Sequence, residues 1–172
     1  YIRNKGQLTA NCYSVYGDLS LLNGKKGIYI VIGNSCKLGC DNRSSIIYIG
    51  STENLQERIR QFRRTLQRGN NQHSGAQKIR KAILINNISQ TCLYIIGFPI
   101  QSQVQNQYQG IWEKAEGCFQ ADYRHFYLID PCFVDQTKDP DFTIFQSISP
   151  NIFPDDARRT IQFILTTIDI FF

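Results

Sequence analysis

Methionine is absent from this chain of 172 residues, tryptophan occurs once, and histidine occurs twice, as His73 and His125. No apolar run approaches the length of about 18 residues that a membrane-spanning helix needs, so we expect no membrane association. The sequence also lacks a Gly-rich phosphate loop and a Gly-x-Ser-x-Gly segment, which leaves NTP hydrolysis and serine hydrolase chemistry without support. Because the chain begins at Tyr1 and contains no methionine, we expect it to be a fragment of a longer gene product.

Cysteine is present, but its pattern does not favour a cross-linked or metal-bound scaffold. The six cysteines are Cys12, Cys36, Cys40, Cys92, Cys118 and Cys132. A domain of this length can bury enough apolar surface without disulfides, so we expect reduced thiols and a cytoplasmic protein. Cys36 and Cys40 resemble half of a zinc knuckle, but no second Cys/His pair with ligand spacing follows. A zinc-stabilised interaction protein is therefore a lesser alternative.

Charge is distributed unevenly along a chain whose composition, 42% hydrophobic and 19% charged, is typical of a globular protein. Residues 55–81 hold eight basic residues and the single acidic residue Glu57, while the whole chain has a net charge of +5. A concentrated basic zone attracts polyanions because binding releases their condensed counterions. We therefore expect nucleic acid as the partner, with a merely solvated helix face as the alternative.

Three segments have the length and composition of β-strands, at residues 27–32, 46–50 and 92–98. Residues 33–45 form a long loop, so we expect the first two strands to pair antiparallel. Side-chain alternation predicts that Tyr29 and Tyr48 lie on one side of this pair. The two phenol groups are then expected to lie close together on that face of the sheet.

The same alternation assigns the apolar residues of these two strands to faces. In the first strand it places Val31 with Tyr29, opposite Ile28, Ile30 and Ile32. In the second strand it places Ile46 with Tyr48, opposite Ile47 and Ile49.

Four segments have helical patterns. Leu55, Ile59, Phe62 and Leu66 form an amphipathic stripe on a helix that we expect to be capped by Ser51 or Thr52 and to end at Arg68 and Gly69. A second helix follows a capping box from Ser74 to Gln77 and ends at Asn86 and Asn87. A third runs from about residue 108 to 127, and a fourth begins near residue 155. We expect residues 1–26 to be an irregular lead-in and 101–109 to be a mobile Gln-rich loop.

Glu116 is the most informative single carboxylate, because it lies at the edge of the apolar stripe of the third helix. That stripe consists of Trp112, Ala115, Phe119, Tyr123 and Phe126. A buried carboxylate is costly unless it is paired, so Glu116 should either hold a metal ion or pair with a cation such as Arg58. Glu113 lies further round the helix and can face water.

Gly27-Ile28-Tyr29 and Tyr48-Ile49-Gly50, followed ten residues after Tyr48 by Arg58 on a helix, resemble the signature of the GIY-YIG nuclease superfamily. The resemblance implies an α/β fold with a small, mainly antiparallel three-stranded sheet flanked by helices. It covers residues 26–130, between an amino-terminal lead-in at 1–25 and a carboxy-terminal extension at 131–172 that packs on the same core. It implies an endonuclease that hydrolyses phosphodiester bonds in DNA, of the homing, restriction or mobile-element type, with RNA not excluded.

The resemblance also implies roles for individual residues. Glu116 would hold one divalent metal ion, Mg²⁺ or Mn²⁺, and Arg58 would neutralise the scissile phosphate. Tyr29 would act as the base and Tyr48 would orient it. The segment from Arg68 to Ser74 is similar to one in intron-encoded homing endonucleases and implies an active-site role for His73, with helix capping as the alternative. The basic side chains expected to grip the nucleic-acid backbone are Arg60, Arg63, Arg64, Arg68, Lys78 and Lys81.

The chain departs from the family pattern at three points. Phe62 stands where many relatives have His or Tyr, and Ser51 stands where others have Lys. The asparagine that often follows the catalytic helix has no counterpart beyond Pro131. A catalytically inactive nucleic-acid-binding module on the same scaffold is therefore the alternative function.

Overall fold

The computed structural model of the protein describes residues 2–3, 9–14, 18–34, 37–40, 44–89, 93–99, 111–128, 130–134, 138–144 and 154–171. Its strands are β1 (Ile2–Arg3), β2 (Thr9–Ser14), β3 (Gly27–Ile32), β4 (Ile46–Thr52) and β5 (Tyr94–Pro99). Its helices are the short 3₁₀ helix η1 (Ser20–Leu22), α1 (Leu55–Arg68), α2 (Ser74–Asn86), α3 (Ile111–Tyr127) and α5 (Pro154–Phe171). None of these described helices is long and apolar enough to cross a membrane.

The strands form one antiparallel sheet in the order β1-β2-β5-β3-β4, with β4 at one edge. The predicted three-stranded sheet is confirmed as its β5-β3-β4 part. The expectation of an irregular lead-in is wrong for residues 2–3 and 9–14, because β2 pairs along the other edge of β5. Backbone pairing needs no alternating apolar pattern, which explains why β2 could not be predicted from the pattern of apolar residues.

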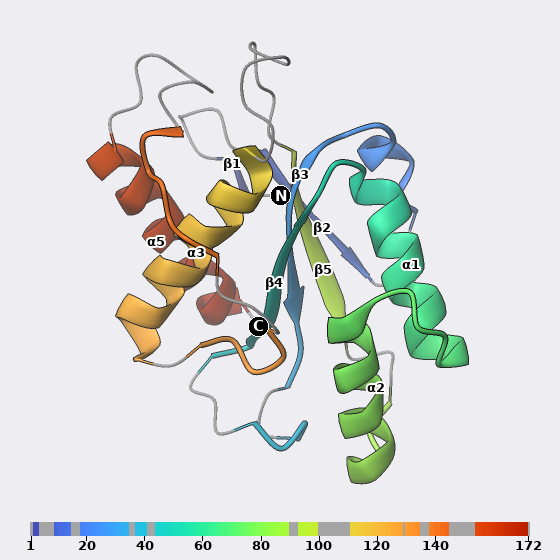
Figure 1. The fold of residues 1–172 in the computed structure, drawn as a ribbon. Helices are drawn as coiled ribbons and strands as arrows, with labels where there is room; N and C mark the ends of the chain where they lie inside the picture. Colours follow the sequence, from blue (N-terminus) through green and yellow to red (C-terminus); the bar gives the residue numbers. More distant parts are fainter. Residues whose placement is uncertain are drawn as a thin grey trace.

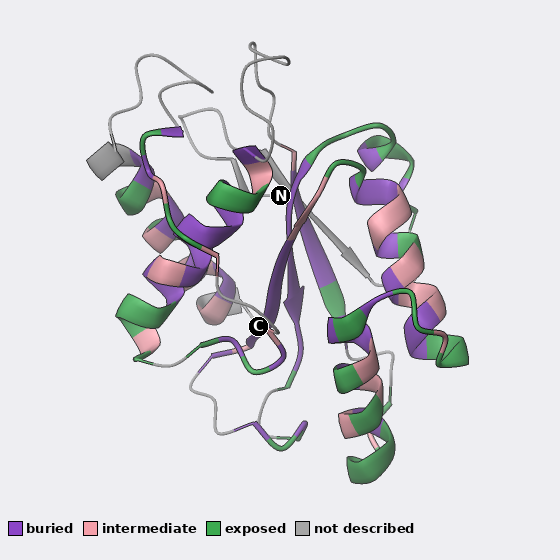
Figure 2. Ribbon diagram, in the orientation of Figure 1, coloured by how far each residue is buried: buried purple, intermediate pink, exposed green. Residues whose placement is uncertain are grey.

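Helices cover both faces of the sheet, with α3 and α5 on one side and α1 and α2 on the other (Figure 1). Each face has its own apolar core, and the buried residues follow the sheet and the inward sides of the helices (Figure 2). The α3/α5 core contains Ile28, Ile30 and Ile32 from β3, together with residues from both helices. The α1/α2 core contains Tyr29, Val31 and Tyr48. The tyrosines therefore lie on the side of the basic helices.

A β-bulge changes the predicted faces of β4. Val31 lies opposite Tyr48, but Ile32 lies opposite Ile46, so Ile47 is an extra residue on the β4 side. As a result Ile47 belongs to the α1/α2 core with Tyr48, while Ile46 belongs to the α3/α5 core. The predicted faces of Ile46 and Ile47 were wrong for this reason, and the predicted pairing of the two tyrosines on one face is confirmed.

The starts of the first two helices also differ from expectation. Asn54 caps α1 by accepting a hydrogen bond from the Glu57 N–H at 3.1 Å, whereas the expected caps, Ser51 and Thr52, are the last residues of β4. The predicted end of α1 is confirmed, because Gly69 adopts a left-handed conformation with φ of 73°. The cap of α2 is His73 rather than Ser74. The expected Gln-rich loop at 101–109 lies outside the described residues.

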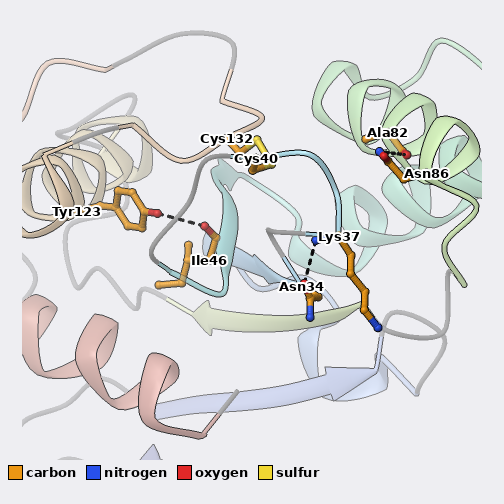
Figure 3. Close-up of a disulfide and its surroundings, with 8 residues drawn as sticks. All are labelled: Asn34, Lys37, Cys40, Ile46, Ala82, Asn86, Tyr123 and Cys132. Carbon is orange, nitrogen blue, oxygen red and sulfur yellow. Dashed lines mark hydrogen bonds between the residues drawn. A yellow bond between two sulfur atoms is a disulfide. The ribbon is translucent and has the colours of Figure 1, made fainter.

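A disulfide joins Cys40, in the loop before β4, to Cys132, beyond α3 (Figure 3). The expectation of reduced thiols was wrong for these two residues, because the fold brings together sulfur atoms that are 92 residues apart in sequence. Cys40 is thus not available as a zinc ligand, and Cys36 lies outside the described residues. Cys118 is a free, buried thiol.

Candidate active site

The two signature tyrosines meet on the α1/α2 face of the sheet. Their ring centroids lie 5.8 Å apart and the rings are stacked at 28°. Tyr29 pairs across the strands with Gly50, and a Cβ atom on Gly50 would lie 2.6 Å from the Tyr29 hydroxyl oxygen. The glycine is therefore required sterically, because any side chain there would displace the Tyr29 ring.

A second glycine, Gly75, packs against the other tyrosine. A Cβ atom at Gly75 would lie 2.3 Å from Cε2 of Tyr48, far closer than real Cβ contacts. Gly75 stands in the first turn of α2, so it lets the helix approach the Tyr48 ring. Sequence reasoning missed this role; the available signal was a glycine inside a predicted helix, where it is intrinsically unfavourable.

His73 connects α2 to Tyr29. Its Nδ1 atom accepts the Ala76 N–H at 3.2 Å and so caps the helix, and its Nε2 atom lies 2.7 Å from the Tyr29 hydroxyl. Because Nδ1 accepts a hydrogen bond, a neutral imidazole carries its proton on Nε2 and donates it to the Tyr29 oxygen. His73 is only 1% exposed. The sequence left two interpretations of His73 open, a helix cap and an active-site residue. The structure shows that His73 caps α2 and also contacts Tyr29.

Phe62 supports His73 through packing. The two ring centroids lie 5.0 Å apart in an edge-to-face arrangement with an angle of 88°, and Phe62 is fully buried in the α1/α2 core. At this position the chain has an apolar ring that holds a histidine in place. Phe62 brings no proton-transfer group to the site.

Arg58 enters the site from the first turns of α1. Its Nη1 atom donates to the side-chain oxygen of Gln61 at 3.2 Å and to the Gln72 carbonyl at 3.3 Å. Burial raises the pKa of Tyr29 well above its ordinary value of 10.0, Tyr48 adds to this rise, and the charge of Arg58 opposes it. The guanidinium therefore stabilises negative charge on the Tyr29 oxygen.

Glu116 reaches the site from the opposite layer, on α3. Its Oε2 atom accepts the Ser51 hydroxyl at 2.6 Å and its Oε1 atom accepts the Gln120 amide at 2.8 Å. The side chain is 7% exposed, and burial raises its pKa above the ordinary value, while the Ser51 hydrogen bond and the charge of Lys138 lower it. Pairing with Arg58, the alternative to a metal-binding role, is not what the structure has, because the direct partners of Glu116 in the described part are the neutral side chains Ser51 and Gln120.

These groups face one cleft of about 500 Å³ at the end of β4, between α3 and the α1/α2 pair. The cleft is lined by Tyr29, Tyr48, Ser51, Arg58, Ser74, Glu113, Glu116, Val134 and Lys138. Four of the five predicted catalytic residues are in this lining, and His73 contacts one of them. Sequence reasoning missed Ser51, Ser74, Val134 and Lys138 as part of the cleft. Glu113 is exposed, as expected, and also lines the cleft.

The six basic residues expected to bind nucleic acid are not among those that line the cleft. Arg60, Arg68, Lys78 and Lys81 are exposed, while Arg63 and Arg64 are half-buried and Arg64 pairs with Glu57. At roughly 100° per residue, Arg60 lies about 160° and Arg64 about 120° from Arg58 around α1. The basic zone thus occupies the outer faces of α1 and α2.

Comparison with protein families matches residues 25–109 to the model of the GIY-YIG catalytic domain. The chain belongs to the GIY-YIG superfamily. Its members are nucleases, which act on nucleic acid and generally use a divalent metal ion. No curated protein and no solved structure matched the chain.

The GIY-YIG cleft suits a divalent cation at Glu116. This carboxylate is desolvated, receives only neutral hydrogen bonds in the described part, and faces a cleft that Glu113 also lines. Mg²⁺ is commonly held by one or two carboxylates together with water and substrate oxygens. Among the described residues no three His, Cys, Asp or Glu side chains gather into a metal site, so water and substrate would supply the other ligands.

Proposed function

We propose that this protein is a metal-dependent endonuclease that hydrolyses phosphodiester bonds in DNA. The observation that carries the proposal is one cleft lined by two phenols, a guanidinium and a buried carboxylate that come from β3, β4, α1 and α3. Hydrolysis of a phosphodiester needs a polarised water, positive charge on the phosphate and a proton acceptor. Those residue types can supply each of these.

Arg58 and Glu116 act on the phosphate. The guanidinium of Arg58 binds a non-bridging oxygen and neutralises the charge that develops there. Glu116 would hold the metal ion, and Ser51 and Gln120 fix the orientation of its carboxylate. A bound Mg²⁺ or Mn²⁺ would add positive charge at the scissile phosphate and lower the pKa of nearby hydroxyl groups.

Tyr29 accepts the proton of the attacking water as a phenolate, and Tyr48 orients it. Burial opposes a phenolate at Tyr29, so this role depends on the charge of Arg58 and on the hydrogen bond from His73, and a cation held at Glu116 would add to their effect. His73 is a positioning residue in this scheme, because it acts on the substrate only through Tyr29.

The exposed cations of α1 and α2 bind flanking backbone without reading bases. DNA is the proposed substrate, in the setting of homing, restriction or a mobile element. Of these, homing is supported by the segment from Arg68 to Ser74, in which His73 contacts Tyr29.

Incubation of supercoiled plasmid with Mg²⁺, compared with EDTA, tests the proposal. We expect metal-dependent nicking by the parent. The nicking rate should fall by about 100-fold or more in Glu116→Gln and in Tyr48→Phe. Glu53→Gln removes an exposed carboxylate outside the cleft and serves as the matched control, which should retain full activity. Glu113→Gln distinguishes the roles of the two carboxylates in the cleft. A smaller loss of nicking in Glu113→Gln than in Glu116→Gln supports Glu116 as the metal ligand.

An inactive nucleic-acid-binding module is the second candidate, favoured by the apolar Phe62 beside His73. It predicts binding of DNA that survives Glu116→Gln, together with no cleavage of plasmid, single-stranded DNA or RNA by the parent. If the parent cleaves RNA but not DNA, the proposed chemistry of the cleft is supported and the proposed substrate is wrong.

We also propose a cytoplasmic location, on composition alone. Disulfides are rare in the cytosol, so the bond between Cys40 and Cys132 would have to persist there against reduction. Cell fractionation followed by immunoblotting tests the location. Recovery of the protein from an oxidising compartment alone would overturn this proposal.

A further inference from the structure

A second cation, Lys138, lines the cleft together with Arg58. It comes from the post-α3 segment, by which we mean the described residues 130–134 and 138–144. This segment lies outside the residues that match the family model. Lys138 is half-buried, and its charge lowers the pKa of Glu116, which lines the same cleft.

The backbone at Lys138 is fixed on α3 beside Glu116. The Lys138 N–H donates at 2.9 Å to the same Gln120 side chain that donates to Glu116. The carbonyl groups of Lys138 and Asp139 also pack so tightly on Gly117 that a Cβ atom there would lie 2.6 Å from the Asp139 oxygen. The position of Lys138 is therefore tied to that of the carboxylate.

The segment is held at both ends as well. Before Lys138, Cys132 is bonded to Cys40, and the Phe133 N–H donates to the Ile47 carbonyl on the free edge of β4 at 3.1 Å. After it, Asp141 pairs with Lys114 of α3 at 3.0 Å. A lysine on a backbone anchored in this way loses less freedom on binding a ligand than one on a loose loop.

The charges of the cleft call for a cation at this place. Glu113 and Glu116 both face the cleft, and uncompensated carboxylates repel a nucleic-acid backbone. Arg58 enters from the other layer, beside Tyr29, and Lys138 is the other cation among the described residues that line the cleft. Ser51, the residue after Gly50, offers only a neutral hydroxyl that Glu116 already accepts.

We propose that Lys138 binds a phosphate oxygen of nucleic acid in the cleft, opposite Arg58, at the scissile phosphodiester or the one next to it. This proposal rests on the proposed function for the identity of the substrate. It assigns the post-α3 segment, and with it the Cys40–Cys132 disulfide, to the construction of the substrate site.

The test measures binding of a fluorescein-labelled DNA duplex in EDTA as a function of salt, so that it does not depend on cleavage. Each phosphate neutralised contributes about 0.9 to the slope of log K against log[salt]. We expect Lys138→Gln to make the slope less negative by about 0.9, and Lys138→Arg to restore it. Lys37→Gln removes an equal charge from an exposed site in the loop at the far end of β3 and β4 and should leave the slope unchanged.

The proposal is overturned if Lys138→Gln and the parent have the same slope. It is also overturned if Lys37→Gln changes the slope as much as Lys138→Gln does, or if the parent shows no measurable binding at low salt. Thermal melts establish that each variant is folded. Single-turnover plasmid nicking in Mg²⁺ separates the two proposals: with an active parent, Lys138→Gln should be slower by about tenfold or more. If the parent binds DNA and Lys138→Gln changes the slope as expected, but the parent does not cleave, the nuclease proposal is wrong and the phosphate contact of Lys138 is still supported.

Discussion

Tyr29 and His73 are joined by a hydrogen bond of 2.7 Å between the phenol oxygen and Nε2, in a pocket where both side chains are nearly inaccessible to water. The other imidazole nitrogen accepts the N–H of Ala76. A proton on Nδ1 would break that helix cap, so the structure favours the tautomer that donates to Tyr29. His73 is therefore suited to stabilise a phenolate and poorly suited to remove the tyrosine proton.

Substitution of His73 by asparagine separates its two functions. Asparagine is a good N-cap, so His73→Asn should keep the start of α2 and change the free energy of unfolding by about 1 kcal/mol or less through the cap. The shorter side chain loses the hydrogen bond to Tyr29, and we expect nicking to fall by about tenfold or more. His73→Ala should lose both. Full activity in a folded His73→Asn variant would contradict the positioning role.

Gly75→Ala should have an effect opposite to that of a usual helix substitution. Alanine in place of glycine in a helix normally stabilises by roughly 1 kcal/mol, but here its Cβ atom would lie 2.3 Å from the Tyr48 ring. Overpacking of this kind costs about 1–3 kcal/mol, so urea unfolding should show a destabilised protein with reduced nicking. Combination with Tyr48→Leu, which removes the aromatic ring, should recover part of the stability. Additive losses in the double variant would place the strain elsewhere.

The sequence predicted the parts of the site that depend on strand alternation and local order. Tyr29 and Tyr48 share a face because each alternates along its own strand, and Glu116 is buried because it borders an apolar stripe. What could not be predicted depends on contacts between distant segments. The bulge at Ile47 is a matter of strand register, and the approach of Lys138 to Glu116 depends on how the post-α3 segment packs on Gly117. Neither leaves a periodic pattern in the chain.

The helix caps illustrate the same limit at short range. Asn54 and His73, rather than Ser51 and Ser74, cap α1 and α2, although serine is a favoured cap residue. Ser51 is used instead by β4 and by Glu116, and His73 is fixed by Tyr29. Tertiary partners thus decided between two local choices of similar energy.

Asp122 should make the stability of the protein depend on pH. It is 2% exposed, its Oδ2 atom has no hydrogen-bond partner in the described part of the chain, and burial raises its pKa from 3.8 to about 6, against the charges of Arg158 and His125. A raised pKa means that the folded state binds the proton more tightly, so this contribution is present below pH 3.8 and is lost as the pH rises through about 6.

Asp122→Asn removes that titration. We expect the variant to be more stable than the parent at pH 8 by about 1–3 kcal/mol and the difference to shrink toward pH 4. Urea unfolding at several pH values measures it, with Glu53→Gln as the control that removes an exposed carboxylate. A constant difference between Asp122→Asn and the parent across this range would show that the carboxylate does not titrate as described.

Reduction of the Cys40–Cys132 disulfide should weaken the fold and the substrate site together. The bond closes a loop between residues 92 apart in sequence, and opening such a loop costs about 2–4 kcal/mol through the entropy of the unfolded chain. We expect dithiothreitol to lower the urea midpoint of the parent and to have no effect on a Cys40→Ser/Cys132→Ser variant, which should match the reduced parent. Because Phe133 and Val134 follow Cys132 directly and Val134 lines the cleft, the reduced protein should also bind a DNA duplex more weakly at fixed salt. An unchanged midpoint on reduction, with thiol counting that confirms the bond was open, would show that the rest of the core holds this segment by itself.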